Sequence, residues 1–431
     1  MTLKPVPPRR LPRPIREFLD TEAASGILLL IGALVALTWA NSPWDGGYES
    51  LWSSEVELAV GPFGFHGDLR AFVNEALMAL FFFVVGLEIK REMTTGELRA
   101  WKTAALPVFA AIGGMVVPAA LYLVFNASGP GSRGWGIPMA TDIAFAVGIL
   151  SLLSRRVPSS LTVFLLSLAI VDDIGSIVVI AVFYTSQVDL GALAVAAGLL
   201  GVMGMLRYAR VFWLPITFAL GAGVWLAVHE SGVHATIAGV VLGLLAPARP
   251  LAPATVARDW ALDLTDDPTQ AELKKLSALA RRSVSFGERL ETLVHPLTSY
   301  VIVPVFALAN AGVPISLSAL GESAPSRVAA GIVAGLVVGK LVGILGASWI
   351  AVRLGFAALP SRANWSHVAG VAGVAGIGFT VSLFIADLAF DDASLVSAAK
   401  LGVLGASAVA AGVGSAVLLL TASNDRGSAA G

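Results

Sequence analysis

The sequence predicts an all-α polytopic membrane protein with twelve transmembrane helices and one small β-hairpin outside the membrane. Of its 431 residues, 56% are hydrophobic and only 13% are charged, whereas soluble domains carry about 25% charged residues. Apolar runs long enough to cross a bilayer as a helix recur along the chain. Basic residues gather in alternate loops, as the positive-inside rule requires of a chain that crosses the membrane repeatedly.

The first apolar run, at 23–40, follows a basic and proline-rich segment. It is either a signal peptide, with Thr38-Trp39-Ala40 as its cleavage site, or an uncleaved first membrane helix. Its length and the many spans that follow favour the helix. Polar and apolar residues then alternate from Glu55 to Val60, before Gly61-Pro62. This pattern predicts a β-hairpin within 44–66.

The other eleven spans are predicted at 70–89, 104–125, 135–154, 159–185, 190–206, 211–228, 232–247, 293–312, 328–350, 366–388 and 396–420. We expect them to form one transporter domain with two bundles. A core bundle takes 104–185 and 328–420, and an interface bundle takes 23–89 and 190–312. The longest loop, 248–290, is charged and contains a predicted amphipathic helix near 270–282.

The distribution of basic residues sets the orientation. One set of loops carries Lys4, Arg9, Arg10, Arg13, Arg16, Lys90, Arg91, Arg99, Lys102, Arg155, Arg156, Arg207, Arg210, Arg249, Arg258, Lys274, Lys275, Arg281, Arg282, Arg289, Arg353 and Arg362. The alternate loops carry Arg70, Arg133 and Arg327, with Lys400 near a helix start and several acidic residues, among them Glu322. Both termini are therefore predicted to be cytoplasmic, and the hairpin lies on the opposite side.

Asp172 and Asp173 lie in the middle of the apolar run 161–184. A carboxylate near the bilayer centre costs roughly 2.5–3.5 kcal/mol on insertion scales, so such a pair indicates a cation or proton site. Neighbours on a helix point about 100° apart. One of the two can therefore face Lys340, in the middle of the tenth span, while the other faces a water-filled funnel.

Two spans in different halves of the chain look interrupted. The fourth contains Pro138, Thr141 and Asp142, and the eleventh contains four glycines before Thr380. Such a pair is typical of inverted-repeat transporters, which bind their ion where the broken helices meet. Asp142 would balance exposed helix N–H groups, and a cation would balance exposed carbonyls. The alternative for the eleventh span is a glycine-rich packing face.

Lys340 lies beside a row of glycines four residues apart, which form a smooth ridge for another helix: Gly331, Gly335, Gly339 and Gly343. Its expected partner is a carboxylate on the fifth helix. That pair is either part of the transport site or an inert structural ion pair, and the second is disfavoured because an apolar pair would cost less. Protons and a small hard cation would compete for the same oxygens, which is enough to make an exchanger. If two protons leave for each sodium ion bound, one net charge moves per cycle.

Further titratable residues lie at the predicted cytoplasmic ends of the spans. Glu88, Arg91 and Glu92 end the second span, and Glu291 and His295 share one face of a helix. They are either a pH sensor or an ordinary charged interfacial belt, and the residues alone favour the belt. His234 is equally explained as a hydrogen-bonded packing residue.

The sequence carries no motif typical of an enzyme. His229 to His234 misses the zinc motif H-E-x-x-H because its second histidine comes one residue late, and 335–340 lacks the spacing of a phosphate loop. The absence of cysteine excludes disulfides and thiolate metal sites. We therefore expect a non-enzyme without a cofactor and without a nucleic-acid partner.

Seven stretches together resemble the NhaA family of bacterial sodium/proton antiporters over nearly the whole chain. They are FFFVVGLEIKRE at 81–92, ATDIAFA at 140–146, VDDIG at 171–175, GVHATIAG at 232–239, His295-Pro296, FALANAGV at 306–313 and GIGFT at 376–380.

The resemblance implies inverted repeats formed by helices 3–5 and 10–12, with helices 4 and 11 crossing as broken chains. It implies that Asp173 is the main Na⁺ ligand and that Asp172 carries a proton and pairs with Lys340, with Thr141 and Asp142 lining the crossing. It assigns pH regulation to Glu88, Arg91, Glu92, His234, Glu291 and His295. A homodimer would form through the hairpin at 44–66. Thr292 departs from relatives that have histidine there, which affects the details of the pH response.

The resulting hypothesis is an electrogenic, pH-regulated antiporter in the bacterial inner membrane that exports Na⁺, and Li⁺, in exchange for H⁺. One alternative is a proton-coupled exchanger of another monovalent cation. The other is a non-transporting membrane scaffold whose buried charges are structural.

Overall fold

The computed structural model describes residues 13–60, 63–154, 157–185, 188–209, 213–250, 253–262, 269–315 and 323–430. These residues form two compact units. The first takes its residues from 1–34, 105–172 and 315–431, and the second from 35–104 and 173–314. Several residues used above for orientation, and the expected turn of the hairpin, lie outside the described residues: Lys4, Arg9, Arg10, Arg155, Arg156, Arg210, Glu322, Gly61 and Pro62.

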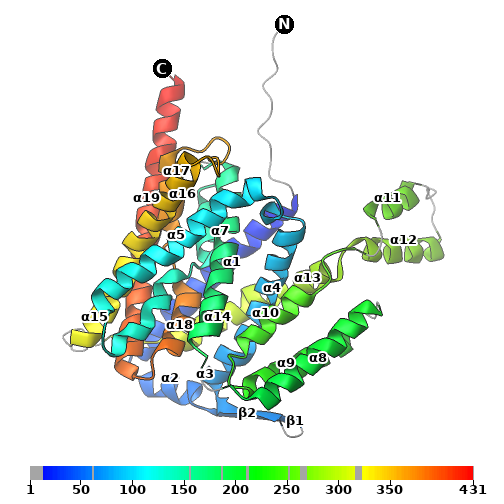
Figure 1. Cartoon of the computed structure of the whole chain (residues 1–431), viewed down its shortest axis with the longest axis horizontal. Coiled ribbons are helices and arrows are strands. Elements are labelled where there is room, and N and C mark those ends of the chain that lie inside the picture. The colour runs from blue at the N-terminus through cyan, green and yellow to red at the C-terminus, as the bar shows by residue number, and fades with distance from the viewer. Residues whose placement is uncertain are drawn as a thin grey trace. The chain divides into compact units, whose positions relative to one another are not determined.

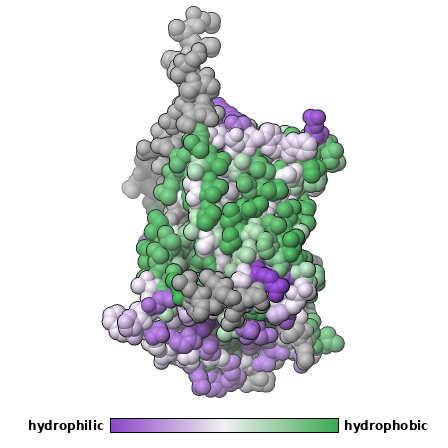
Figure 2. Space-filling view, turned by 90° about the vertical axis from the view of Figure 1, so that its left-hand side faces the viewer, coloured by the Kyte–Doolittle hydropathy of each residue, from purple (hydrophilic) through white to green (hydrophobic). Residues whose placement is uncertain are grey.

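Within the described ranges, seven continuous helices are long and apolar enough to cross a membrane. Three bent pairs of helices add one span each if each pair is counted as one, and two further apolar helices are shorter. The chain is thus a largely helical, multi-span membrane protein, while the count of twelve spans stays a prediction. On the face drawn in Figure 2, hydrophobic residues form a broad band, and hydrophilic residues gather outside it. Large side chains such as Val116, Val124 and Val182 are exposed, as on a surface that faces lipid.

The first unit contains both interrupted spans and the helices around them. They are the start of α1 (Arg13–Ala40), α5 (Trp101–Asn126), the 3₁₀ helix η3 (Pro130–Met139), α6 (Ile143–Leu152), α7 (Ser159–Phe183) as far as Asp172, α15 (Ser323–Val333), the π-helix η6 (Ala334–Gly339), α16 (Lys340–Arg353), α17 (Trp365–Val374), α18 (Phe379–Ala389) and α19 (Ala393–Ala430). Helices α17 and α19 lie side by side (Figure 1).

The glycine ridge of the tenth span packs against α5, as predicted. A Cβ on Gly343 would lie 2.1 Å from the carbonyl oxygen of Gly113, and one on Gly339 would lie 2.7 Å from the Cα of Pro118. Both distances are too short for a side chain. The two backbones therefore approach as closely as only glycine permits.

Both spans predicted to be interrupted are broken. Segments η3 and α6 meet at a bend of 40° across Ala140-Thr141-Asp142, and α17 and α18 meet at a bend of 49°. In the eleventh span the glycines surround the break and do not serve as a packing face alone. Gly376 lies there against the carbonyl oxygen of Leu336, 2.5 Å from where its Cβ would be.

The second unit holds the remaining elements. They are the end of α1, α2 (Asp45–Trp52), β1 (Glu55–Val60), β2 (Phe63–Asp68), α3 (Leu69–Phe72), the π-helix η1 (Val73–Leu77), α4 (Met78–Thr94), the 3₁₀ helix η2 (Glu97–Arg99), the rest of α7, α8 (Leu190–Tyr208), α9 (Leu214–Glu230), α10 (Thr236–Leu245), α11 (Ala254–Leu262), α12 (Gln270–Ser283), α13 (Phe286–Leu297), the π-helix η4 (Thr298–Ile302) and α14 (Val303–Asn310). The predicted amphipathic helix near 270–282 is α12.

The β-hairpin begins later than the predicted segment 44–66 and ends two residues beyond it, at Asp68. Strands β1 and β2 pair antiparallel, from Glu55 opposite Asp68 to Val60 opposite Phe63, whereas 45–52 form α2. The reason is the spacing of Tyr48 and Trp52, which lie four residues apart and are both buried. That is a helical period and not the alternation of a strand.

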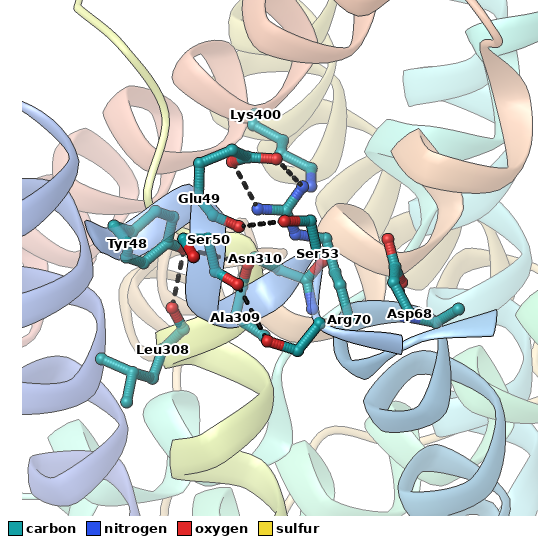
Figure 3. A network of polar contacts seen from close by, with 12 residues as sticks. Tyr48, Glu49, Ser50, Ser53, Asp68, Arg70, Leu308, Ala309, Asn310 and Lys400 are labelled. Carbon is teal, nitrogen blue, oxygen red and sulfur yellow. Dashed lines mark hydrogen bonds and ion pairs between the residues drawn. The ribbon is translucent and has the colours of Figure 1, made fainter. Parts of the chain in front are cut away.

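A polar network holds α2 against the end of α14 (Figure 3). The Tyr48 hydroxyl lies 2.8 Å from the carbonyl oxygen of Leu308 and 2.9 Å from that of Ala309. Arg70 pairs with Glu49 at 3.0 Å. These bonds hold α2, which precedes the first strand of the hairpin, against α3 and the end of α14.

Candidate ion-binding site

The breaks of the two interrupted spans are hydrogen-bonded to each other. The Thr141 hydroxyl donates to the carbonyl oxygen of Ala375 at 2.9 Å, and the Asp142 N–H donates to that of Ile377 at 2.7 Å. Each carbonyl belongs to the end of α17 or to the residues just after it. Backbone groups that lack a helical hydrogen bond are costly inside a membrane. Here, carbonyl oxygens at one break accept hydrogen bonds from residues at the other break.

Asp142 serves the starts of two helices with one carboxylate. Its Oδ1 accepts from the Phe145 N–H at 3.0 Å, which caps α6. Its Oδ2 accepts from the Thr380 N–H at 3.0 Å and from the Thr380 hydroxyl at 2.7 Å. The first turns of α6 and α18 both carry partial positive charge, which a carboxylate stabilises. Asp142 thus accepts hydrogen bonds from N–H groups at the starts of both helices.

Lys340 lies directly after the π-helix η6 and joins the fifth span to the fourth. Its Nζ is 2.6 Å from Asp172 Oδ2 and 2.9 Å from the Thr141 hydroxyl oxygen. Both side chains of the Lys340–Asp172 pair are fully buried. The predicted carboxylate partner on the fifth helix is therefore Asp172. A π-turn often marks a functional site because it re-aims a side chain within a helix.

The pair leaves one acceptor unused. Asp172 Oδ1 is buried and has no hydrogen-bond partner among the described residues. A buried, unpaired carboxylate oxygen normally has a reason, such as a catalytic role or an ion. Carboxylate, hydroxyl and carbonyl oxygens suit a hard cation. This oxygen can take a proton or a hard cation, and either would compete with Lys340 for the same carboxylate.

Asp173 is the next residue of the continuous helix α7, so its side chain points about 100° away from that of Asp172. It is 4% exposed and begins the second unit. Four of the five residues predicted to form the transport site are thus connected. Lys340 bonds to both Thr141 and Asp172, and Asp142 follows Thr141 in the chain. These four are Asp142, Thr141, Lys340 and Asp172, and Asp173 adjoins them along the chain.

The sequence did not single out Thr380 as the partner of Asp142. Thr380 was noted only as a mid-span threonine, although its position two residues after the last glycine of the interruption is a signal for a helix start. Ser176 lies four residues after Asp172 on α7, and its hydroxyl is buried with no partner among the described residues.

Four of the six residues assigned to pH regulation form two neighbouring pairs between α4 and α13. Arg91 makes an ion pair with Glu291. The His295 ring nitrogen Nε2 is 3.9 Å from Glu88 Oε1, and both of these side chains are mostly buried. An interfacial belt would be solvated, so this burial favours a specific cluster over the belt.

Glu92 and His234 have local roles instead. Glu92 accepts a hydrogen bond from the Glu97 N–H at 3.0 Å, which holds the turn after α4. His234 Nε2 is 2.8 Å from the carbonyl oxygen of Tyr184 and so fits the packing alternative. Among the residues that the structure describes, no group of three or more histidine, aspartate or glutamate side chains could hold a metal ion.

Comparison with known proteins gives one consistent family. A family model described as Na⁺/H⁺ antiporter 1 matches residues 16–418. The chain is 48% identical over 407 residues to the Na(+)/H(+) antiporter NhaA 3 of Frankia alni, which covers 94% of this chain and 88% of the relative. It is 48% identical over 413 residues to NhaA 2 of Myxococcus xanthus, covering 93% and 87%. It is 47% identical over 419 residues to NhaA of Rhodopirellula baltica, covering 95% and 94%.

Proposed function

Because the chain belongs to the Na⁺/H⁺ antiporter family whose model matches residues 16–418, we propose that it exports sodium ions in exchange for protons at Asp172 and Asp173. The observation that carries this proposal is the fully buried Lys340–Asp172 pair beside the hydrogen-bonded breaks of two spans. A scaffold needs no such pair, since apolar side chains of the same size would cost less.

In the proposed cycle, Asp173 binds Na⁺ and Asp172 carries a proton. When Asp172 and Asp173 are ionised, their oxygens and those of water replace the hydration shell of the ion. The bond from Lys340 to Asp172 Oδ2, 2.6 Å long, weakens as the cation draws on the same carboxylate. When protons return, both carboxyls become neutral and the ion leaves. Exchange then requires only that the site open to one side at a time.

Charge balance makes the exchange electrogenic. If two protons leave for each sodium ion that binds, one positive charge moves inward per cycle. A membrane potential then contributes about 2.3 kcal/mol per 100 mV to the export of sodium. Lithium, a smaller ion with the same charge and the same preference for oxygen ligands, is carried at the same site.

Further properties belong to the same proposal. Helices 3–5 and 10–12 form inverted repeats whose broken members cross near the middle of the membrane. The cluster of Glu88, Arg91, Glu291 and His295 regulates exchange by pH, and the mostly buried pair of His295 and Glu88 supports this role. The chain lies in the inner membrane with both termini cytoplasmic. It forms a homodimer through the hairpin of β1 and β2.

Everted membrane vesicles with an entrapped pH dye test the proposal. Added sodium should release protons from vesicles that hold the wild-type chain, and Asp173→Asn should abolish this response. Asp189→Asn is the matched control, because Asp189 is exposed and caps α8, and asparagine caps a helix equally well. Sodium-driven proton release that persists in Asp173→Asn would contradict the site. An exchange rate that ignores an imposed potential would contradict electrogenic exchange.

A proton-coupled exchanger of another monovalent cation is the alternative, and the same assay decides it. Potassium replaces sodium in the external medium at equal concentration. A response to potassium and none to sodium would establish the alternative. A response to neither cation, from protein that is present and folded, would establish the scaffold.

A further inference from the structure

Helices α11 and α12 form a pair that plays no part in the proposed transport site. They lie against each other and project from the start of α13 (Figure 1). Lys275 Nζ lies 4.4 Å from the centre of the Trp260 ring, and the Ser283 hydroxyl is 3.3 Å from the carbonyl oxygen of Pro253. The pair is therefore a small folded element and not an extended loop.

The chain holds this pair next to the start of a candidate membrane span. Helix α12 ends at Ser283, and α13 begins at Phe286, the first residue of a candidate span that runs to Asn310. The three residue steps from Ser283 to Phe286 reach at most about 11 Å. The Gly287 N–H donates to the carbonyl oxygen of Pro247 at 3.0 Å, which fixes the start of α13 to the end of α10. The end of α12 therefore stays within a few residues of the start of this candidate span.

One face of α12 is both apolar and exposed. Leu273 is 48% exposed, and Ala280, seven residues later on the same face, is exposed too. Lys274 and Arg281 flank this stripe at the same spacing. The partly buried Leu276 and Leu279 lie on the neighbouring side. An exposed leucine with basic residues along one side of it is compatible with a helix that lies in the plane of a membrane surface.

The charge of α12 favours an anionic surface. Four basic residues, Lys274, Lys275, Arg281 and Arg282, stand against one acid, Glu272. Glu272 is engaged in the capping box with Thr269. The acidic residues of the connecting segment 263–268 lie outside the described residues. Basic side chains within a Debye length of anionic lipid are attracted to it.

We propose that α12 rests on the anionic headgroups of the leaflet next to the start of α13. Leu273 enters the boundary between headgroups and acyl chains, and Lys274 and Arg281 extend along the surface to the lipid phosphates, as long basic side chains do. The side that bears Ala278 and Arg282 faces water. The loops on this side of the membrane carry most of the basic residues, which is the side where bacterial and other cytoplasmic leaflets present negative charge.

The absence of cysteine from the chain allows a direct test in the full-length protein. Leu273→Cys and Ala278→Cys place one thiol each on α12, about 140° apart around the helix. Each thiol is labelled with an environment-sensitive fluorophore, and the protein is held in nanodiscs of phosphatidylcholine, with or without phosphatidylglycerol. A quencher attached to the lipid acyl chains reports contact with the membrane.

The proposal predicts a blue shift and several-fold stronger quenching at position 273 than at 278, in nanodiscs that contain phosphatidylglycerol. Adding Lys274→Gln and Arg281→Gln to Leu273→Cys should lower the bound fraction relative to the free fraction roughly thirtyfold. Lys275→Gln and Arg282→Gln, the matched control on the side of α12 opposite Leu273, should change it much less. These exposed substitutions leave the membrane spans unaltered, so sodium-driven exchange checks that each variant is folded.

Three results would overturn the proposal. Equal exposure to water at both positions in anionic nanodiscs would show that α12 does not touch the membrane. Equal quenching at 273 with and without phosphatidylglycerol would show that charge plays no part. Shielding of position 273 that needs two copies of the chain in one nanodisc would assign the face to a protein contact.

Discussion

The Asp142 carboxylate and Thr380 join the two interrupted spans, because one carboxylate oxygen accepts both the N–H and the hydroxyl of Thr380, at 3.0 and 2.7 Å. The other oxygen of the same carboxylate caps α6. The starts of two helices that are more than two hundred residues apart in sequence thus share one negative charge. The Lys340–Asp172 pair is attached to this joint through Thr141.

We expect Thr380→Val to destabilise the protein by about 1–3 kcal/mol, because it removes a donor from a buried, charged acceptor. Thr421→Val is the matched control. Thr421 is also buried, but its hydroxyl bonds only to the carbonyl of Val417 in its own helix. Thermal unfolding in detergent compares the two variants, and sodium-driven exchange should fall only in Thr380→Val. Equal losses of stability and of exchange in the two variants would mean that the bond between Thr380 and Asp142 contributes no more than a bond within one helix.

The Lys340–Asp172 pair should show strong energetic coupling. Lys340→Met leaves a buried carboxylate without its partner and should cost about 3–5 kcal/mol, whereas Asp172→Asn with Lys340→Met removes both charges and should recover most of this loss. A double-mutant cycle on the unfolding temperature measures the coupling. The double variant should nevertheless remain inactive in exchange. Transport by the double variant would show that the pair is structural.

Gly343→Ala should separate α5 from α16. The new Cβ would lie 2.1 Å from the carbonyl oxygen of Gly113, so the backbones must move apart, which costs about 1–3 kcal/mol as overpacking does. Gly346→Ala, in the same helix, meets nothing within 4 Å. It should be neutral, or stabilising by up to about 1 kcal/mol, because alanine favours a helix more than glycine does. Unfolding temperatures that move in the same direction would contradict this packing.

The start of α12 should depend on pH through Glu272. The N–H and hydroxyl of Thr269, each 2.8 Å from the Glu272 carboxylate, hold the pKa of Glu272 below its ordinary value of 4.5. Since the folded pKa is lowered, the cap contributes in full above pH 4.5 and is lost as the pH falls through the folded pKa.

Hydrogen exchange of the first-turn amides of α12, corrected for intrinsic rates, measures this effect. Protection should fall below the pKa of Glu272 in the wild-type chain and should vary less in Glu272→Gln. The same pH dependence in both proteins would assign the change to another group.

The sequence by itself determined the class of the protein and most of its polar site. Apolar runs, basic loops and the cost of carboxylates in lipid are properties of composition and spacing, so they can be read without coordinates. Asp142, Asp172, Asp173 and Lys340 stand out for that reason. The interruptions at 140–142 and 375–378 could also be predicted, because proline and glycine act on the backbone locally.

The tertiary structure decided which groups meet, because contacts between segments two hundred residues apart leave no periodic signal in a single sequence. It selected Asp172 as the partner of Lys340, and it gave Asp142 a donor, Thr380, that spacing alone did not single out. It also showed that Glu92 and His234 bond to backbone groups. The other four residues assigned to pH regulation form two side-chain pairs, Arg91 with Glu291 and His295 with Glu88. Spacing limits where a helix lies, but only packing fixes which face of it meets another helix.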